Sequence, residues 1–261
     1  YFYVVFGMPQ ATSDEREYCH MEFKELVTPS LTELFIKEME HMILSGELKI
    51  GDRLPTEREL SEHMKVSRAV INGGLNQLSA MGFLRVAPRK GVFVNDYIAT
   101  GNIDVLTAIM EYNGWRFTPE YLEPILQFRM SVEPYCMELA ALNSDARHQA
   151  AISDIVTELK NQEPDSVDPE LIFTFYHTIA IAGGNIILPL ILNTFKPVYV
   201  SIGRVIVRLG NAGALIEDFE HICNAIADHN IDAAKSRDLK CIEECRRVIS
   251  SHYRPGDYFA E

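Results

Sequence analysis

Two helix starts lie close together in this sequence, and they limit what the N-terminal part of the chain can fold into. Thr56 and Glu59 have the spacing of a capping box, in which the hydroxyl and the carboxylate accept hydrogen bonds from unpaired amides at the helix start. Ser67 is also of a type that begins helices, and it stands just before an apolar-periodic run. The first helix must therefore end near Met64 and Lys65, before a turn of about three or four residues. This spacing predicts a helix-turn-helix.

Apolar patterns on both sides extend this unit. Residues at helical spacing precede it between Leu31 and Ile43, and Gly46 ends that helix. After Gly82 the pattern changes to two strand-like segments, FLRV and GVFV, around the turn APRK. A basic hairpin tip after a helix-turn-helix is placed to touch phosphates or the minor groove, as a wing does. The expected fold class is mainly α, with an N-terminal winged helix-turn-helix and a small β-hairpin wing.

The distribution of charge supports this interpretation better than the total charge does. The formal net charge is −13, which by itself disfavours contact with DNA. However, no Asp or Glu occurs between Glu62 and Asp96. The Lys and Arg residues in that window are Lys65, Arg68, Arg85, Arg89 and Lys90. A local basic surface in an acidic protein indicates double-stranded DNA as a partner.

The middle of the second helix of this unit is unusual, because it reads Asn72-Gly73-Gly74. Each glycine costs a helix interior roughly 1 kcal/mol relative to alanine. Leu75 and Leu78 keep the apolar spacing, and such packing supplies most of the stability of a helix in a protein. We therefore expect a recognition helix that is present but loosened at its centre.

The run from SGELKIGDRLPTERELSEHMKVSRAV to GFLRVAPRKGVFV resembles the winged helix-turn-helix of GntR-family bacterial transcription regulators. The elements G-D-x-L-P-[ST]-E-R-E-L, V-S-R and R-x-G-x-F-V stand in the family's order. The resemblance implies that Arg58 faces DNA and that Ser67 and Arg68 begin the recognition helix. It also implies DNA-binding roles at the wing tip for Arg89, Lys90 and Gly91. Arginine can bridge guanine O6 and N7, or clamp a phosphate.

The chain departs from this family inside the recognition helix. Relatives commonly carry V-R-E-A-L where this sequence has Ile71-Asn72-Gly73-Gly74-Leu75. Asn72 thus stands at the usual arginine position. Asparagine pairs with adenine, whereas arginine pairs with guanine, so we expect Asn72 to be a DNA-binding residue that favours adenine in the operator. The alternative is an effector-binding homologue with weakened or altered DNA binding.

Beyond residue 98 no stretch alternates as a strand does, and the proline and glycine breaks predict an all-α helical bundle. The expected helices span 102–112, 119–142, 146–162, 168–183, 185–209, 212–229 and 231–252. Three segments resemble the helical effector domain, called FCD, of the FadR branch of the GntR family: LQFRMSVEPYCMELAAL, FYHTIAIAGGNIILPLIL and NAIADHNIDAA. The resemblance implies that a small-molecule effector in this bundle controls DNA binding.

Many FCD domains bind a divalent metal through one Asp and three His. The corresponding positions in this chain are Phe173, His177, Phe219 and Cys241. Two phenylalanines cannot ligate a metal, and one His with one Cys cannot complete a zinc site. We therefore expect no metal cofactor. We expect Phe173, His177 and Phe219 to line an effector pocket that is more apolar than a metal-binding one.

Arginines in the C-terminal part are the candidates for holding an effector carboxylate. Arg204 and Arg208 share one face of an otherwise apolar helix, and Arg129 lies in an earlier helix. The competing role is a structural ion pair with an acidic residue, for which the candidates are Glu133, Glu217 and Asp218. An acyl-CoA is an alternative effector, because a related metal-free branch binds fatty acyl-CoA.

The sequence as a whole indicates a transcription regulator, with repression as the default mode, that binds a palindromic operator as a homodimer. The expected parts are 1–23 (a leader or extension), 24–96 (winged helix-turn-helix), 97–102 (linker), 103–254 (effector-binding and dimerisation domain) and 255–261 (tail). No apolar run is long enough for a membrane partner, and an odd number of cysteines without a C-x-x-C pair fits the cytoplasm. An enzyme is disfavoured, because no nucleophile–base pair or glycine-rich phosphate loop is present.

Overall fold

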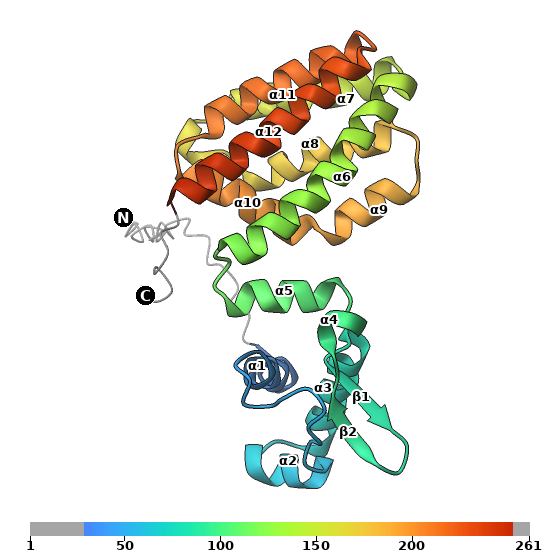
Figure 1. The fold of residues 1–261 in the computed structure, drawn as a ribbon, viewed down its shortest axis with the longest axis vertical. Helices are drawn as coiled ribbons and strands as arrows, with labels where there is room; N and C mark the ends of the chain where they lie inside the picture. The colour runs from blue at the N-terminus through green and yellow to red at the C-terminus, as the bar shows by residue number, and fades with distance from the viewer. Residues whose placement is uncertain (1–28, 253–261) are drawn as a thin grey trace, which may run out of the picture.

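The computed structural model of this chain describes residues 29–252, so the segments expected as a leader (1–23) and a tail (255–261) lie outside the described residues. The described chain forms two lobes, each with its own apolar core (Figure 1). The N-terminal lobe carries a two-stranded sheet, and the C-terminal lobe is a bundle of helices. The predicted fold class, mainly α with a winged helix-turn-helix and a helical bundle, is confirmed.

Capping explains where the paired helices of the N-terminal lobe begin. Helix α2 (Glu57–Met64) starts after Thr56, which forms the predicted capping box. Lys65 then takes a left-handed conformation and ends the helix. Helix α3 (Arg68–Met81) begins after the N-cap residue Ser67, whose hydroxyl accepts a hydrogen bond from the third amide of the helix. These contacts produce the tight turn between α2 and α3.

The hairpin predicted as a wing follows α3. Strand β1 (Leu84–Ala87) pairs antiparallel with strand β2 (Gly91–Val94). Leu84 and Val94 lie opposite each other and are buried in the core of the lobe. The other end of the hairpin, with its turn, projects away from the lobe (Figure 1).

The segment predicted as a linker is folded onto the end of α3. Residues Tyr97–Thr100 form the short helix α4. The amide of Asn102 donates a hydrogen bond to the carbonyl of Met81, the last residue of α3. Helix α5 (Ile103–Tyr112) starts directly after Asn102, and it lies between the two lobes (Figure 1). The direction of α5 is therefore set by the end of the recognition helix.

Helix α5 contributes to both cores, which differs from its assignment to the effector domain (103–254). Its residues in the N-terminal core are Val105, Ala108 and Ile109. Met110 is buried in the core of the bundle. An ion pair between Lys37 and Glu111 also ties α5 to the first helix of the N-terminal lobe. The sequence did not reveal this role, because the apolar spacing of a helix does not say which neighbour covers each face.

The C-terminal bundle is built around helix α8 (Pro169–Ala182). The other helices are α6 (Pro119–Asn143), α7 (Ala146–Lys160), α9 (Ile187–Thr194), α10 (Lys196–Arg208), α11 (Ala212–Ala227) and α12 (Ile231–His252), with a short 3₁₀ turn at Pro164–Ser166. Helix α8 is apolar on most of its sides, and a helix with that pattern belongs in the centre of a domain. It packs against α6, α7, α9 and α10, while α11 covers α6 and α7, and α12 covers α6.

The single helix predicted over 185–209 is in fact two helices. Helices α9 and α10 are bent by 62° at a break around Phe195. Pro197 lies in the first turn of α10, where its missing amide costs no helical hydrogen bond. Pro197 was thus the available signal for this break. Within the described residues no single helix is long and apolar enough to cross a membrane, although the bent α9–α10 pair has the length and composition.

Helix α1 (Leu31–Leu44) and helix α3 cross at Gly74. A β-carbon on Gly74 would lie 2.2 Å from Cδ1 of the Phe35 ring, which is buried. A β-carbon on Gly73 would meet only Thr32 Cγ2 at 3.6 Å, which is an ordinary contact. The helix is thus closely packed at Gly74 rather than loosened there. Packing therefore requires glycine at position 74 but not at position 73.

Alanine substitutions separate these two glycines. We expect Gly73→Ala to raise the free energy of unfolding by about 0.5–1 kcal/mol, because alanine favours a helix and meets no obstacle at this site. Gly74→Ala should lower it by about 1–3 kcal/mol, because the buried Phe35 ring would have to move. Urea unfolding followed by circular dichroism measures both. Adding Phe35→Leu to Gly74→Ala should recover part of the loss, and a Gly74→Ala protein as stable as wild type would contradict the packing argument.

Candidate nucleic-acid interface and the buried polar cluster of the bundle

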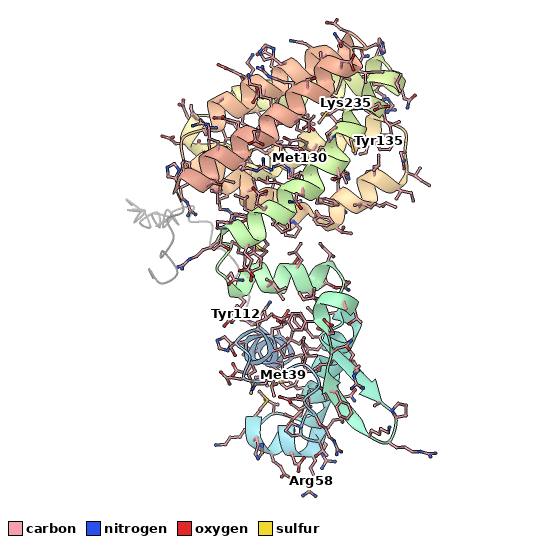
Figure 2. All side chains as sticks on the ribbon, in the orientation of Figure 1. Met39, Arg58, Tyr112, Met130, Tyr135 and Lys235 are labelled. Atoms are coloured by element: carbon pink, nitrogen blue, oxygen red, sulfur yellow. The ribbon has the colours of Figure 1, made fainter. Side chains whose placement is uncertain are left out.

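The residues assigned to DNA lie at one end of the molecule. Helix α2, the start of helix α3 and the hairpin turn occupy the part of the N-terminal lobe that is farthest from the bundle (Figure 1). Arg58 projects from α2 at this end (Figure 2). Its exposed guanidinium pairs with Glu62 at 3.2 Å. An exposed pair of this kind is worth little, so a DNA phosphate can replace Glu62 at small cost.

The start of α3 presents a second basic group. Arg68 is the first residue of α3 and is exposed. The Ser67 oxygen accepts a hydrogen bond from the amide of Val70 at 3.3 Å, so Ser67 caps the helix. A hydroxyl donates as well as accepts, and the Ser67 proton can therefore still go to a phosphate oxygen.

Asn72 lies one turn further along α3 and is exposed. Its amide nitrogen donates to Glu57 Oε1 at 3.2 Å, and its amide oxygen accepts from Asn76 Nδ2 at 3.0 Å. Sequence reasoning missed both partners. The contact with Asn76 could have been predicted from the sequence, because residues four apart are neighbours on a helix surface. Glu57 lies on another helix, and no sequence spacing connects it to Asn72.

The wing tip has a left-handed backbone. Its exposed basic residues are Arg89 and Lys90. Gly91 has a φ of 115°, which favours glycine. The guanidinium of Arg53 packs against Gly91, since a β-carbon there would lie 3.0 Å from Arg53 Nε. The guanidinium of Arg85 lies 4.7 Å from the centre of the Phe93 ring. Arg53 and Arg85 therefore add positive charge beside the wing, and neither was among the predicted DNA contacts.

In the bundle, Arg129 is buried and already paired. Its guanidinium donates to the two Glu133 carboxylate oxygens at 2.5 and 3.1 Å. It also donates to the Tyr176 hydroxyl at 3.2 Å, and the Tyr199 hydroxyl donates to Glu133. Of the two roles considered for Arg129, the structure shows the buried ion pair. An effector carboxylate could reach Arg129 only by displacing Glu133 and leaving its charge unpaired.

Asp238 lies beside this ion pair and is fully buried. Within the described residues neither of its carboxylate oxygens meets a hydrogen-bond donor. Burial and the adjacent Glu133 carboxylate raise the pKa of Asp238 well above its ordinary value. A proton on Asp238 supplies the hydrogen bond to Glu133 that two ionised carboxylates cannot form. With Asp238 neutral, the cluster of Arg129, Glu133 and Asp238 carries no net charge.

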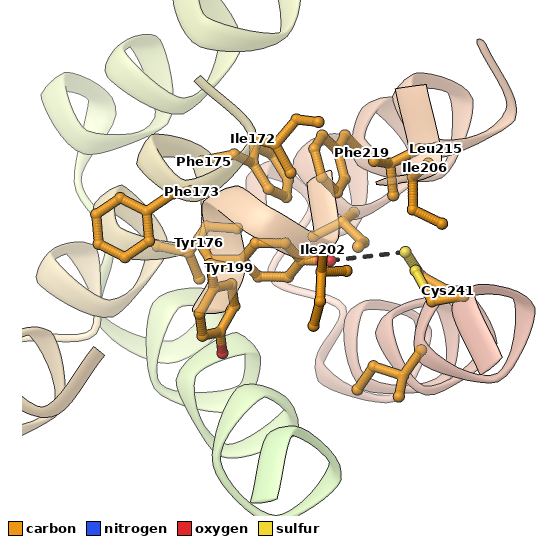
Figure 3. Packing of buried hydrophobic residues seen from close by; sticks show 14 of the residues in the cluster. Ile172, Phe173, Phe175, Tyr176, Tyr199, Ile202, Ile206, Leu215, Phe219 and Cys241 are labelled. Atoms are coloured by element: carbon orange, nitrogen blue, oxygen red, sulfur yellow. Dashed lines mark hydrogen bonds between the residues drawn. The ribbon is translucent and has the colours of Figure 1, made fainter. Parts of the chain in front are cut away.

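The positions compared above with a metal site belong to an aromatic core. Phe219 stacks on Phe175, with ring centroids 3.9 Å apart (Figure 3). Tyr176 meets Phe219 edge-on at 5.4 Å. Aromatic pairs of this kind are worth about 0.5–1.5 kcal/mol beyond the burial of their area. These side chains fill the centre of the bundle with packed aromatic rings.

The other positions of that set are also engaged in packing. Phe173 is buried and stacks on the half-buried His177, with 5.4 Å between ring centroids. Cys241 Sγ lies 3.6 Å from the Tyr176 hydroxyl, as the dashed line in Figure 3 marks. Across residues 29–252 no group of three or more His, Cys, Asp or Glu side chains is placed to hold a metal ion.

Arg204 and Arg208 lie on the exposed face of α10. The opposite face, which includes Ile202 and Ile206, is buried in the bundle. The two arginines therefore do not line the core, contrary to the expectation that they hold an effector carboxylate there. Their spacing showed that they share a face. It did not show which face of the helix the rest of the bundle covers.

Known proteins resemble this chain over most of the residues that the structure describes. Residues 33–94 match the family described as bacterial regulatory proteins, gntR family, and residues 95–242 match the FadR C-terminal domain. The fatty acid metabolism regulator protein of Shewanella halifaxensis is 34% identical over 169 residues, which cover 65% of this chain and 69% of that protein. The HTH-type transcriptional regulator Mce2R of Mycobacterium tuberculosis is 24% identical over 216 residues, or 82% and 90% of the two chains. A solved structure of Listeria monocytogenes Lar matches with a TM-score of 0.55 at 14% identity, covering 87% of this chain and 100% of that chain, so the fold is shared.

The raised pKa of Asp238 predicts how stability depends on pH. The folded state binds a proton that the unfolded state releases above about pH 4, so this contribution to stability falls as pH rises from there towards the folded pKa of Asp238. Asp238→Asn removes the titration and keeps a donor for Glu133. We expect its stability relative to wild type to increase between pH 5 and pH 8 in urea unfolding. The exposed Asp154→Asn serves as the control and should show no such trend; a constant difference for Asp238→Asn would contradict a proton on Asp238.

Proposed function

Because the chain belongs to the GntR family of bacterial regulatory proteins and carries a FadR C-terminal domain, it is a DNA-binding transcription regulator, and we propose that it represses genes of fatty acid metabolism until a fatty acyl ligand binds. The name of the Shewanella halifaxensis relative supports the class of pathway. Occlusion of a promoter by the bound protein is the mode of action that we propose.

The charge balance in the bundle favours an acyl chain over a small carboxylate as the ligand. A small free carboxylate would need Arg129, whose charge Glu133 already matches. An acyl chain needs only apolar contacts, and the packed core of the bundle, which includes Phe173 and Phe219, is apolar. We therefore place the acyl chain beside these two rings and His177. Its polar head would lie away from the Arg129 cluster.

The far end of the N-terminal lobe, which carries Arg58, Arg68, Asn72 and the wing tip and which we call the reading surface, supports binding to double-stranded DNA. We propose that Arg58, Arg68 and the basic wing tip contact phosphates or guanine edges, and that Asn72 reads a base in the major groove. The remainder of this acidic protein repels DNA, so this surface must supply the attraction. Binding through phosphates releases counterions and weakens steeply with salt.

Helix α5 provides the route by which a ligand in the bundle would act on DNA binding. It packs on α1 and α3 on one side, and a short turn joins it to α6. Helix α6 carries Arg129 and Glu133 at the centre of the bundle. An acyl chain that displaces α6 would therefore rotate the N-terminal lobe as one unit. Effector coupling of this kind is worth about 1–3 kcal/mol.

We also propose that the protein acts as a homodimer. A group of exposed apolar residues lies at and just before α9; its members are Ile186, Ile187, Leu190 and Ile191. Exposed apolar patches of this kind mark contact surfaces. A twofold dimer would place two recognition helices on the half-sites of a palindromic operator.

Fluorescence anisotropy with DNA from upstream of the protein's own gene tests the regulatory function. Wild type should bind this DNA more tightly than a scrambled sequence. Arg68→Ala should weaken binding about tenfold or more, because it removes one bidentate or phosphate contact. Lys160→Ala in the bundle is the control and should bind as wild type does. Equal affinity for both DNA sequences would contradict operator recognition.

The same assay tests the ligand. Saturating oleoyl-CoA should weaken binding to the upstream DNA by about 5- to 150-fold. Short dicarboxylates should have no effect, because Arg129 is already paired. Phe219→Ala should reduce the response to oleoyl-CoA without weakening DNA binding in its absence. A response to dicarboxylates alone would contradict the proposed class of ligand.

Sedimentation velocity tests the dimer surface. Leu190→Asp should shift the protein from dimer to monomer, because a charge would be buried in an apolar contact. Ile50→Asp changes an equally apolar, exposed residue of the N-terminal lobe and should leave the dimer intact. A Leu190→Asp protein that remains dimeric would place the dimer contact elsewhere.

A further inference from the structure

Three polar side chains on the reading surface form one chain of hydrogen bonds. Asn72 Nδ2 donates to Glu57 Oε1 at 3.2 Å, and Asn76 Nδ2 donates to Asn72 Oδ1 at 3.0 Å. All three residues are exposed. Glu57 is the first residue of α2, whereas Asn72 and Asn76 lie one turn apart on α3. This series of hydrogen bonds therefore spans the two helices of the helix-turn-helix on the side proposed to face DNA.

These hydrogen bonds fix the orientation of the Asn72 amide. A carboxylate only accepts hydrogen bonds, so Glu57 must face the nitrogen of the amide and not its oxygen. Asn76 reinforces the same orientation by donating to the oxygen. An exposed asparagine without such partners changes rotamer within picoseconds to nanoseconds. The Asn72 amide is thus oriented before DNA arrives.

The donors and acceptors that remain determine what the oriented amide can read. A side-chain amide has two N–H donors and two oxygen lone pairs. Glu57 takes one N–H and Asn76 takes one lone pair, which leaves one donor beside one acceptor. In the major groove adenine presents one acceptor, N7, beside one donor, the N6 amino group. Guanine presents two acceptors, N7 and O6, and the single remaining N–H cannot satisfy both.

We propose that Glu57 and Asn76 are positioning residues that clamp the Asn72 amide so that it reads adenine and rejects guanine in the operator. This inference rests on the proposed binding of Asn72 to the major groove and adds the residues that set its base preference. Glu57 and Asn76 act through Asn72 and need not touch a base themselves. Their carboxylate and amide groups are required, not their size.

Selection of binding sites from random DNA, followed by sequencing, tests the clamp in the full chain. Wild type should select adenine at one position of each half-site. Asn76→Ala should lower the adenine-to-guanine preference at that position about tenfold, because the Asn72 amide, then held by Glu57 alone, can rotate out of that contact and offer both N–H groups to guanine. Total affinity for the best site should change less, because the phosphate contacts remain.

Matched variants separate positioning from a general structural role. Asn76→Gln keeps an amide donor within reach of residue 72 and should retain the preference. Gln77→Ala changes an exposed neighbour five positions from Asn72, which is off its helical face, and should leave the preference unchanged. On α2, Glu57→Gln keeps an acceptor, whereas Glu57→Ala removes it and should lower the preference as Asn76→Ala does. Loss of helix stability alone would weaken binding to every sequence without changing the preference at one position.

The outcomes distinguish the clamp from the function on which it rests. If wild type selects an operator and both Asn76→Ala and Glu57→Ala retain its base preference, the clamp is overturned and DNA binding stands. If wild type selects guanine or no particular base at the Asn72 position, the clamp is also overturned. If wild type enriches no sequence at all, the proposed operator recognition fails, and the clamp fails with it.

Discussion

The close crossing of α1 and α3 at Gly74 is the contact on which the placement of the reading surface depends. The Phe35 ring occupies the space that a β-carbon would take, so the two helices approach each other as only glycine allows. Helix α5 packs onto both of them, and the Lys37–Glu111 ion pair adds a second tie to α1. The end of α3 also sets the start of α5, through the hydrogen bond from Asn102 to Met81. The N-terminal lobe and α5 can therefore move as one body when the bundle changes.

The bundle has its own constraint, which is a polar cluster inside an apolar core. A buried guanidinium is costly unless its charge is matched and its hydrogen bonds are made, and Glu133 does both for Arg129. The tyrosines on α8 and α10 complete the hydrogen bonds, and Asp238 reaches the cluster from α12. Four helices thus meet at one electroneutral point. A ligand that enters the bundle is favoured if it leaves this cluster intact, and for that reason an acyl chain fits better than a small acid.

Local patterns predicted much of the fold and part of the site. The caps at Thr56 and Ser67, the acid-free window and the hairpin turn are short-range features, and the structure reproduces the helix-turn-helix and wing that they indicate. Other features depend on partners that are distant in the sequence. Spacing placed Arg204 and Arg208 on one face of a helix but did not show that this face is exposed. Likewise, nothing in the sequence near Asn72 pointed to Glu57 on the preceding helix.

The sequence by itself determined the types and order of most elements, because helix caps, turn residues and apolar periodicity act over a few neighbouring residues; the break between α9 and α10 and the short helix α4 were not predicted. It also determined which side chains carry charge, and so where a polyanion can bind. Only the tertiary structure decided which of these elements pack against each other and which side chains meet. It showed that Gly74 is required by Phe35, that Arg129 is neutralised by Glu133, and that α5 belongs to both cores. Each of these facts is a contact between separate helices, and such contacts follow from how the whole chain fills its interior.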